Sequence, residues 1–227
     1  MSAASTTLTP ETFAPLVDHT LLKPEATQAQ VEKIIEEARE FGPASVCVNG
    51  LWVPLVAAGL RDTDVLACAV VGFPLGAMRS SVVAAEAAQA VEDGAGELDM
   101  VIPVGLLRAE DDAAAESYVA AVRAAAPDVV LKVILETALL SDDQIVRACR
   151  VSVAGGADFV KTSTGFNPAG GATVEAVRLM RDTVGEGIGV KASGGVRSLE
   201  DAQAMVDAGA SRLGMSGAVA VLEQLRG

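Results

Sequence analysis

Eight short apolar runs recur along the chain, and this repeat is the feature that most restricts its possible folds. Each run is followed by a polar or glycine-rich turn and then by a segment with helical spacing of apolar residues. The runs occupy residues 15–22, 44–50, 65–74, 97–105, 129–137, 158–166, 187–195 and 211–218. Strands that alternate with helices at this spacing form βαβ units, in which the strands are parallel. Eight such units in about 200 residues favour a closed (β/α)8 TIM barrel over an open sheet.

Amphipathic segments separate the apolar runs. Within residues 28–41, one helical face carries four apolar side chains, namely Val31, Ile34, Ile35 and Ala38. Two later segments have the same pattern and end in glycines that can terminate a helix, Gly94 and Gly209. No shift of composition and no Pro/Ser-rich linker divides the chain. We therefore predict a single domain over residues 1–227, with residues 1–14 as a helical or frayed N-terminal lead-in.

Charge and cysteine usage exclude several classes of protein. The net charge of −13 argues against nucleic acid and against anionic membranes as partners. No apolar stretch reaches the ~18 residues of a membrane helix, and the N-terminus lacks the pattern of a signal peptide. Cys47, Cys68 and Cys149 are an odd number of widely spaced cysteines, which fits a reducing cytoplasm. With His19 as the single histidine, we expect no catalytic metal and no other cofactor, and we expect His19 itself to be structural, at the first strand's turn.

Three of the five lysines lie in predicted strands: Lys132, Lys161 and Lys191. Lysine is depleted in strands and is rarely buried without a partner. One strand lysine could extend its charge to the surface, but three on consecutive strands indicate a shared role. In each strand a neighbouring valine supplies the apolar outer face that the helices cover. Because side chains alternate along a strand, all three lysines are predicted to point into the barrel.

Carboxylates accompany these lysines. Asp99 alternates with apolar neighbours and is predicted to face inward, as is Glu136, and Asp18 and Cys47 are further candidates from the first two strands. Clustered cations and burial both push the pKa of a lysine down. A neutral amine is a nucleophile that forms a Schiff base with a carbonyl, while carboxylates and hydroxyls can relay protons. These residues indicate carbonyl chemistry through an imine, without selecting one lysine or one substrate.

The last three strands end in the glycine-rich turns "TSTGF" (162–166), "ASGGV" (192–196) and "GMSGA" (214–218). Barrels of this kind often bind phosphate with the loops after strands 7 and 8, where backbone amides can approach an oxyanion. The candidate binding residues are Thr164, Gly165, Gly194, Gly195, Ser216 and Gly217. The alternative interpretation is that these glycines only permit the positive φ of tight turns.

Taken together, several motifs resemble the deoxyribose-phosphate aldolase family, in unbroken order from about residue 15 to the C-terminus. They are "DHTLLKPEAT", "VCVN", "VGFPLG", "ELDMVI", "LKVILET", "DFVKTSTGF", "VKASGGVR" and "GASRLGMSGA". The resemblance implies a metal-independent class I aldolase on a (β/α)8 barrel. Such an enzyme interconverts 2-deoxy-D-ribose 5-phosphate with D-glyceraldehyde 3-phosphate and acetaldehyde. Its partners are small-molecule substrates, and a homodimer is a possible assembly.

The resemblance also implies a role for each interior polar residue. Lys161 corresponds to the Schiff-base lysine, a choice that spacing alone does not make. Lys191 corresponds to the neighbouring cation that favours the neutral amine. Asp99 is implied to act with a water as the acid/base relay, and Lys132 and Asp18 to complete the polar network.

Some positions depart from the family pattern or keep an open interpretation. Phe166 stands where some relatives have a basic residue, and Gly217 stands where many have a second serine, so two possible phosphate ligands are missing. Cys47 is implied to lie near the substrate, although a small core residue is the alternative. Other functions compatible with the residues are a different Schiff-base barrel aldolase, a transaldolase-like enzyme, or a non-catalytic barrel that binds sugar phosphate.

Overall fold

Eight parallel strands close into a barrel in chain order, in a computed structural model that describes residues 7–227. The strands are β1 (Val17–Leu21), β2 (Ser45–Asn49), β3 (Leu66–Val71), β4 (Glu97–Val101), β5 (Val130–Ile134), β6 (Phe159–Lys161), β7 (Gly189–Ser193) and β8 (Arg212–Met215). The barrel closes where β1 pairs with β8, with Val17 opposite Leu213. The predicted (β/α)8 barrel is confirmed.

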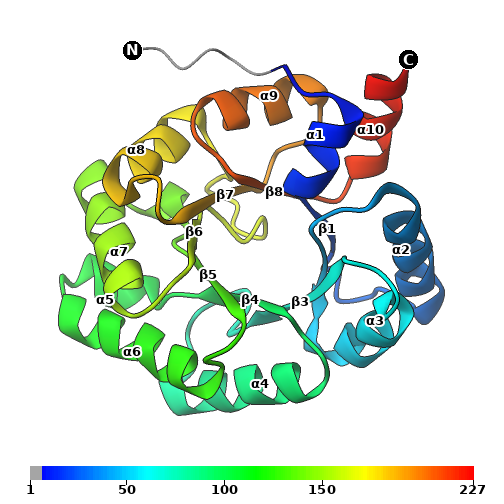
Figure 1. The fold of residues 1–227 in the computed structure, drawn as a ribbon. Coiled ribbons are helices and arrows are strands. Elements are labelled where there is room, and N and C mark those ends of the chain that lie inside the picture. The colour runs from blue at the N-terminus through cyan, green and yellow to red at the C-terminus, as the bar shows by residue number, and fades with distance from the viewer. Residues whose placement is uncertain (1–6) are drawn as a thin grey trace.

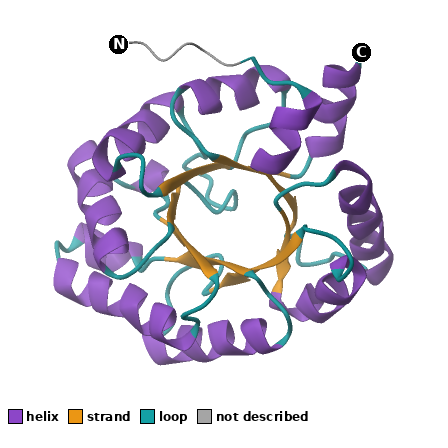
Figure 2. Ribbon diagram, viewed as in Figure 1, coloured by secondary structure: helices purple, strands orange, loops and turns teal. Residues whose placement is uncertain are grey.

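Helices form a ring around the barrel (Figure 1), and Figure 2 shows the strands enclosed within it. They are α1 (Pro10–Phe13), α2 (Gln28–Phe41), α3 (Val53–Leu60), α4 (Ser80–Glu92), α5 (Val104–Arg108), α6 (Asp112–Ala125), α7 (Asp142–Ala154), α8 (Val174–Val184), α9 (Leu199–Asp207) and α10 (Ala218–Arg226). Short 3₁₀ helices occupy Ala14–Leu16, Gly50–Trp52 and Thr137–Leu139. Within the part of the chain described, no helix is both long and apolar enough to cross a membrane.

The predicted lead-in falls partly outside the described residues, which begin at residue 7. Its described part contains α1, which lies beside α10 (Figure 1). Leu8 and Phe13 are buried in the main hydrophobic core, so this stretch packs against the barrel.

The sequence explains where several helices begin and end. Ser141 and Gln144 form a capping box at the start of α7, and Ser198 and Asp201 form another at the start of α9. The predicted apolar face of α2 is confirmed, because all four of its residues are buried. Gly94 and Gly209 follow α4 and α9 with φ values of 101° and 108°, a conformation that glycine adopts without steric cost.

The two faces of the barrel wall differ in character. The outward valines of β5, β6 and β7 are fully buried beneath the helices. Inside, Lys132 and Lys191 are fully buried and Lys161 is 3% exposed, so all three lysines point inward as predicted. The register places Asp99 next to Lys132 and Lys161 next to Lys191, so charges of opposite sign meet inside the barrel.

Two interior glycines make room for larger neighbours. A Cβ atom on Gly189 would lie 2.1 Å from the ring of Phe159, which fills the barrel at that level. A Cβ atom on Gly214 would lie 3.1 Å from Cε of Lys191 and 2.8 Å from Cβ of Ser193. The absence of a side chain at position 214 therefore allows the Lys191 stem to reach the centre of the barrel.

Candidate active site

A cluster of seven buried or half-buried charges lies inside the barrel and is called the charged cluster below. Its cations are Lys132, Lys161, Lys191 and Arg212, and its carboxylates are Asp18, Glu97 and Asp99. The side chains come from β1, β4, β5, β6, β7 and β8. The barrel thus brings together residues that are distant in sequence, including all five predicted catalytic residues.

Asp99 is the centre of the charged cluster. Its Oδ2 atom accepts hydrogen bonds from Lys161 and Lys191, each at 2.6 Å, and its Oδ1 atom accepts one from Lys132 at 2.8 Å. Burial alone raises a carboxyl pKa, but the three ammonium groups outweigh it and hold the pKa of Asp99 well below its usual range. Asp99 is therefore an ionised carboxylate at neutral pH.

Two of the lysines are more firmly protonated than their burial suggests, which corrects one expectation from the sequence. Burial lowers the pKa of Lys132, but the charges of Asp18 and Asp99 exceed that effect and bring it well above its ordinary value. The same balance raises the pKa of Lys191. At these two lysines the neighbouring carboxylates therefore outweigh both burial and the clustered cations.

Lys161 has a different environment from the other cations. Among the described residues it has one carboxylate partner, Asp99, whereas Lys132 has three and Lys191 has two. The four cations of the cluster face three carboxylates, so one unit of positive charge is left uncompensated if all are ionised. The loss of one proton removes this excess. Of the three interior lysines, Lys161 has the fewest carboxylate contacts.

Asp18 is held in place by three hydrogen-bond donors inside the barrel. Its Oδ1 atom accepts hydrogen bonds from Ser45 Oγ at 2.7 Å and from Arg212 Nη1 at 2.5 Å, and its Oδ2 atom accepts one from Lys191. Glu97 lies 2.6 Å from Lys132 and 2.9 Å from Arg212. Glu97 and Arg212 were not predicted, although each stands two residues before an inward-facing position, at Asp99 and Gly214.

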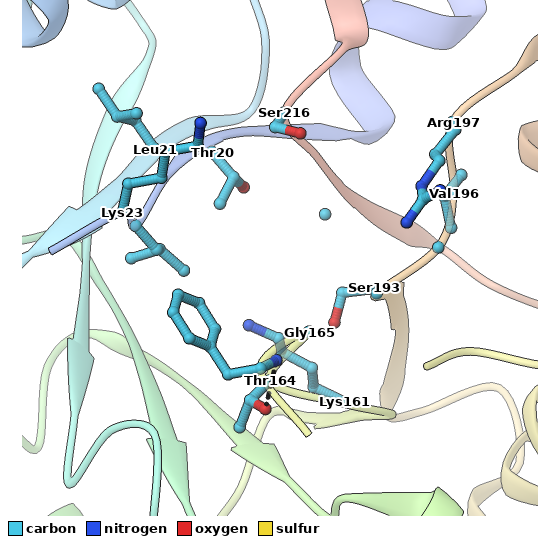
Figure 3. Close-up of a pocket in the computed structure, with 15 residues that line it drawn as sticks. Thr20, Leu21, Lys23, Lys161, Thr164, Gly165, Ser193, Val196, Arg197 and Ser216 are labelled. Carbon is cyan, nitrogen blue, oxygen red and sulfur yellow. Dashed lines mark hydrogen bonds between the residues drawn. The ribbon is translucent and has the colours of Figure 1, made fainter. Parts of the chain in front are cut away.

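A cavity of about 320 Å³ opens above Lys161 at the carboxyl ends of the strands. Figure 3 shows the Lys161 amine pointing into it, with Thr164 and Gly165 beside the lysine and Ser216 and Arg197 farther across. The predicted binding residues that line it are Thr164, Gly165, Gly194, Gly195 and Ser216. A volume of this size accommodates a small sugar phosphate.

Two cations of the cavity wall were not predicted. Arg197 follows the glycine pair after β7, and Lys23 follows β1. The side chain of Phe166 also lines the cavity and packs edge-to-face against Phe73, with ring centroids 5.2 Å apart. Arg197 and Lys23 therefore add two positively charged side chains to the cavity wall.

The loops that line the cavity are fixed by close backbone contacts. A Cβ atom on Gly171 would lie 1.9 Å from the Gly194 carbonyl oxygen, so only glycine allows this approach. The Ala172 amide donates to the same oxygen at 2.8 Å. Gly194 and Gly195 have φ values of 80° and 97°, so the glycine pair also satisfies the turn geometry.

Glu136, which follows β5, anchors the loop after β6 through its carboxylate. Its carboxylate accepts hydrogen bonds from the Thr164 amide at 3.1 Å and from the Thr164 hydroxyl at 2.6 Å. The Thr164 hydroxyl in turn accepts from the Phe166 amide at 3.1 Å. Glu136 has a φ of 57°, a strained value for a residue other than glycine, and these hydrogen bonds offset the strain.

The remaining predicted residues do not line the cavity. Cys47 is fully buried in a small apolar group, and Gly217 precedes the first turn of α10. His19 is on the outer face of β1, where its Nε2 atom lies 2.7 Å from Glu37 of α2. His19 therefore joins a strand to a helix, in place of the expected contact with the turn.

A (β/α)8 barrel that presents a buried lysine to a cavity next to an ionised carboxylate has the architecture of a lysine-dependent aldolase. The family model of DeoC/LacD family aldolases matches residues 12–226. The chain belongs to this family.

Individual relatives agree with this assignment. The chain is 57% identical over 223 residues to the deoxyribose-phosphate aldolase of Micrococcus luteus, covering 95% of the chain and 97% of the relative. It is 54% identical to the deoxyribose-phosphate aldolase of Lactococcus lactis, covering 92% and 94%. The tetrameric deoxyribose phosphate aldolase of Aeropyrum pernix superposes with a TM-score of 0.88 at 36% identity, covering 96% and 92%. The resemblance inferred from the motifs is confirmed.

Proposed function

We propose that this chain is a class I aldolase that interconverts 2-deoxy-D-ribose 5-phosphate with D-glyceraldehyde 3-phosphate and acetaldehyde. The observation that carries the proposal is the position of Lys161. Of the three interior lysines, it is the one that lines the cavity, and it has the fewest carboxylate partners. The names of relatives at 54–57% identity support the choice of substrate.

The reaction begins with Lys161 as a neutral amine. Its nitrogen attacks the C1 aldehyde of the open-chain sugar, and the carbinolamine loses water to give an iminium ion. Lys191 stays protonated beside it, held by Asp18 and Asp99. Its charge opposes a second cation at Lys161, so it favours the neutral amine in the free enzyme.

Carbon–carbon bond cleavage then requires a base. Asp99, acting through a water, accepts the proton of the C3 hydroxyl as the C2–C3 bond breaks. The iminium takes up the bonding electrons as an enamine, and D-glyceraldehyde 3-phosphate leaves. Protonation of the enamine at C2 and hydrolysis of the imine release acetaldehyde and restore Lys161. Lys132 holds Asp99 in position through its hydrogen bond to Oδ1, and Asp18 holds Lys191.

The phosphate end of the substrate binds across the cavity from Lys161. The backbone amides of Gly194 and Gly195 and the Ser216 hydroxyl supply hydrogen-bond donors there, and Arg197 supplies a charge. Thr164 and Gly165 line the wall on the Lys161 side. Gly217 and Cys47 complete the proposed binding set. Gly217 directly follows Ser216, and Cys47 packs with Leu22, which lines the cavity.

Product analysis tests this function. Incubation with 2-deoxy-D-ribose 5-phosphate should release acetaldehyde and D-glyceraldehyde 3-phosphate in equal amounts, and Lys161→Arg should abolish both because a guanidinium does not form an imine. Release of a different aldehyde or ketone would favour another Schiff-base aldolase or a transaldolase-like enzyme. Binding of the sugar phosphate without any product would favour a non-catalytic barrel.

We also propose a cytoplasmic location and assembly into a homodimer. Three free cysteines support a reducing compartment. Exposed apolar side chains after β2 and β3, among them Leu51, Leu75 and Met78, support a contact between copies. Sedimentation analysis tests the assembly, and a monomer at micromolar concentration would contradict it.

A further inference from the structure

Cys47 and Cys68 form a pair of thiols at the base of the active site. They are register partners on the adjacent strands β2 and β3, and both side chains are fully buried inside the barrel. Their sulfur atoms and a carboxylate oxygen of Asp99 all lie within 4.8 Å of one another. Adjacent strands are about 4.8 Å apart, which is within the ~4.4–6.8 Å range of Cα separations in disulfides. The two sulfurs can therefore be joined with little movement of either strand.

The two thiols differ in their acidity. A hydrogen bond between the two thiols lowers the pKa of the Cys47 thiol, and the ammonium groups of Lys191 and Lys161 lie near enough to add to this effect. Burial raises the pKa of the Cys68 thiol well above its ordinary value, and the hydrogen bond to Cys47 raises it further. This asymmetry assigns Cys47 as the nucleophilic thiol and Cys68 as the thiol that responds to it.

The environment favours oxidation of this pair over metal binding. Two thiols and the Asp99 carboxylate are a possible ligand set. However, Asp99 already accepts hydrogen bonds from three ammonium groups, which a divalent cation would have to displace. A neutral oxidant can react with the sulfurs without displacing these ammonium groups. Leu22, which lines the cavity, packs in the same apolar group as both cysteines, so the sulfurs lie directly behind the cavity wall.

We propose that hydrogen peroxide converts Cys47 and Cys68 into a reversible intramolecular disulfide. The Cys47 thiolate attacks one peroxide oxygen, so an S–O bond forms, the O–O bond breaks, and hydroxide leaves and is protonated to water. This step gives a sulfenic acid on Cys47. The Cys68 sulfur then attacks the Cys47 sulfur, so the S–S bond forms and a second water leaves. Two thiols are oxidised and one peroxide is reduced to two waters.

Oxidation changes the hydrogen bonds of Asp99. The Cys68 thiol donates to Asp99 Oδ1 at 3.3 Å and accepts from Lys132 at 3.4 Å. A disulfide has no S–H donor, so Asp99 loses one of its partners. Losing a hydrogen bond to a charged group typically changes the affected equilibrium or rate constant by about ten-fold or more. We therefore expect oxidation to lower the rate of the proposed aldolase reaction by about ten-fold, with recovery on reduction.

The test is peptide mass mapping of the intact chain after treatment with a small excess of hydrogen peroxide, with remaining thiols alkylated under denaturing conditions. The expected result is one cross-link that joins the Cys47 and Cys68 peptides and disappears with dithiothreitol. This result is read by mass alone and is therefore independent of the proposed activity. Alkylation of both cysteines after peroxide treatment, or a cross-link that involves Cys149, would overturn the proposal.

Two variants sharpen the test. Cys68→Ser keeps a hydroxyl donor towards Asp99 but has no second sulfur, so peroxide should give higher oxidation states of Cys47 that dithiothreitol does not reverse. Cys149→Ser is the matched control. Burial raises the pKa of Cys149 to about 12, and this cysteine lies in α7 outside the barrel, so its variant should form the cross-link as the parent does. If Cys68→Ser loses and regains activity like the parent, the disulfide is not responsible and the proposal fails.

Discussion

Lys161 and Lys191 are register partners on β6 and β7, and their ammonium groups share one oxygen, each lying 2.6 Å from Asp99 Oδ2. Two cations at one oxygen repel each other, so the arrangement is relieved if one of them loses its proton. Lys191 has a second carboxylate partner in Asp18, and Lys161 has none among the described residues. This difference supports the proposed roles, in which Lys191 is the permanent cation and Lys161 is the nucleophilic amine.

Replacing Lys191 tests this division of roles. Lys191→Met removes the neighbouring cation, so less charge opposes the protonation of Lys161. We expect kcat/KM at pH 7 to fall by at least about a hundred-fold, within the 10²–10⁴ range of acid–base contributions. The acidic limb of the pH–rate profile, where activity rises as Lys161 loses its proton, should shift to higher pH. Lys191→Arg is the matched control, since it keeps the charge. An unchanged pH profile with a raised KM would instead make Lys191 a binding residue.

Arg197 is expected to recognise the phosphate group. Arg197→Met should raise KM for 2-deoxy-D-ribose 5-phosphate by about ten-fold or more, because a hydrogen bond to a charged group contributes roughly 1.5–3 kcal/mol. The kinetics of unphosphorylated deoxyribose should change little, and this comparison is the control. An equal rise in KM for both substrates would show that Arg197 supports the cavity wall without selecting phosphate.

Position 217 offers a converse test. A Cβ atom on Gly217 meets no other atom within 4 Å, and its φ of −108° suits any residue, so Gly217→Ser introduces a hydroxyl without strain. We expect KM for the phosphorylated sugar to fall by up to about ten-fold while that for deoxyribose stays the same. If phosphate binding does not improve, the backbone amides and Arg197 already satisfy the phosphate.

The stability of the protein should fall in acid. The pKa values of Asp18 and Asp99 are depressed in the folded state, so below about pH 5 the unfolded chain binds more protons than the folded one. The free energy of unfolding should therefore decrease steadily as the pH falls from about 5 to 3, as measured by urea titrations. Asp99→Asn has one such group fewer and should show a shallower slope. A free energy that is constant over this range would contradict the ionic balance described for the charged cluster.

The fold could be predicted because its signal is repeated and local. Eight apolar runs, each with its own turn and helix, leave few alternatives to a closed barrel. The inward orientation of Lys161 and Asp99 follows from the alternation of side chains along a strand. The same alternation gives Glu97 and Arg212, the first residues of β4 and β8, an inward orientation.

Other features depend on distances that the sequence does not contain. The raised pKa of Lys191 depends on how closely Asp18 and Asp99 approach it from other strands. Arg197 reaches the cavity because of the path of the loop after the glycine pair. Glu136 was placed on an inward face, but its hydrogen bonds to Thr164 require its left-handed backbone conformation.

The covalent intermediate is the central claim, and reductive trapping measures it directly. The chain is incubated with 2-deoxy-D-ribose 5-phosphate and borohydride, digested, and mapped by mass spectrometry. The account predicts one adduct, a reduced imine on Lys161, and none in the Lys161→Arg variant. An adduct on Lys132 or Lys191, or activity that is insensitive to borohydride in the presence of substrate, would contradict it.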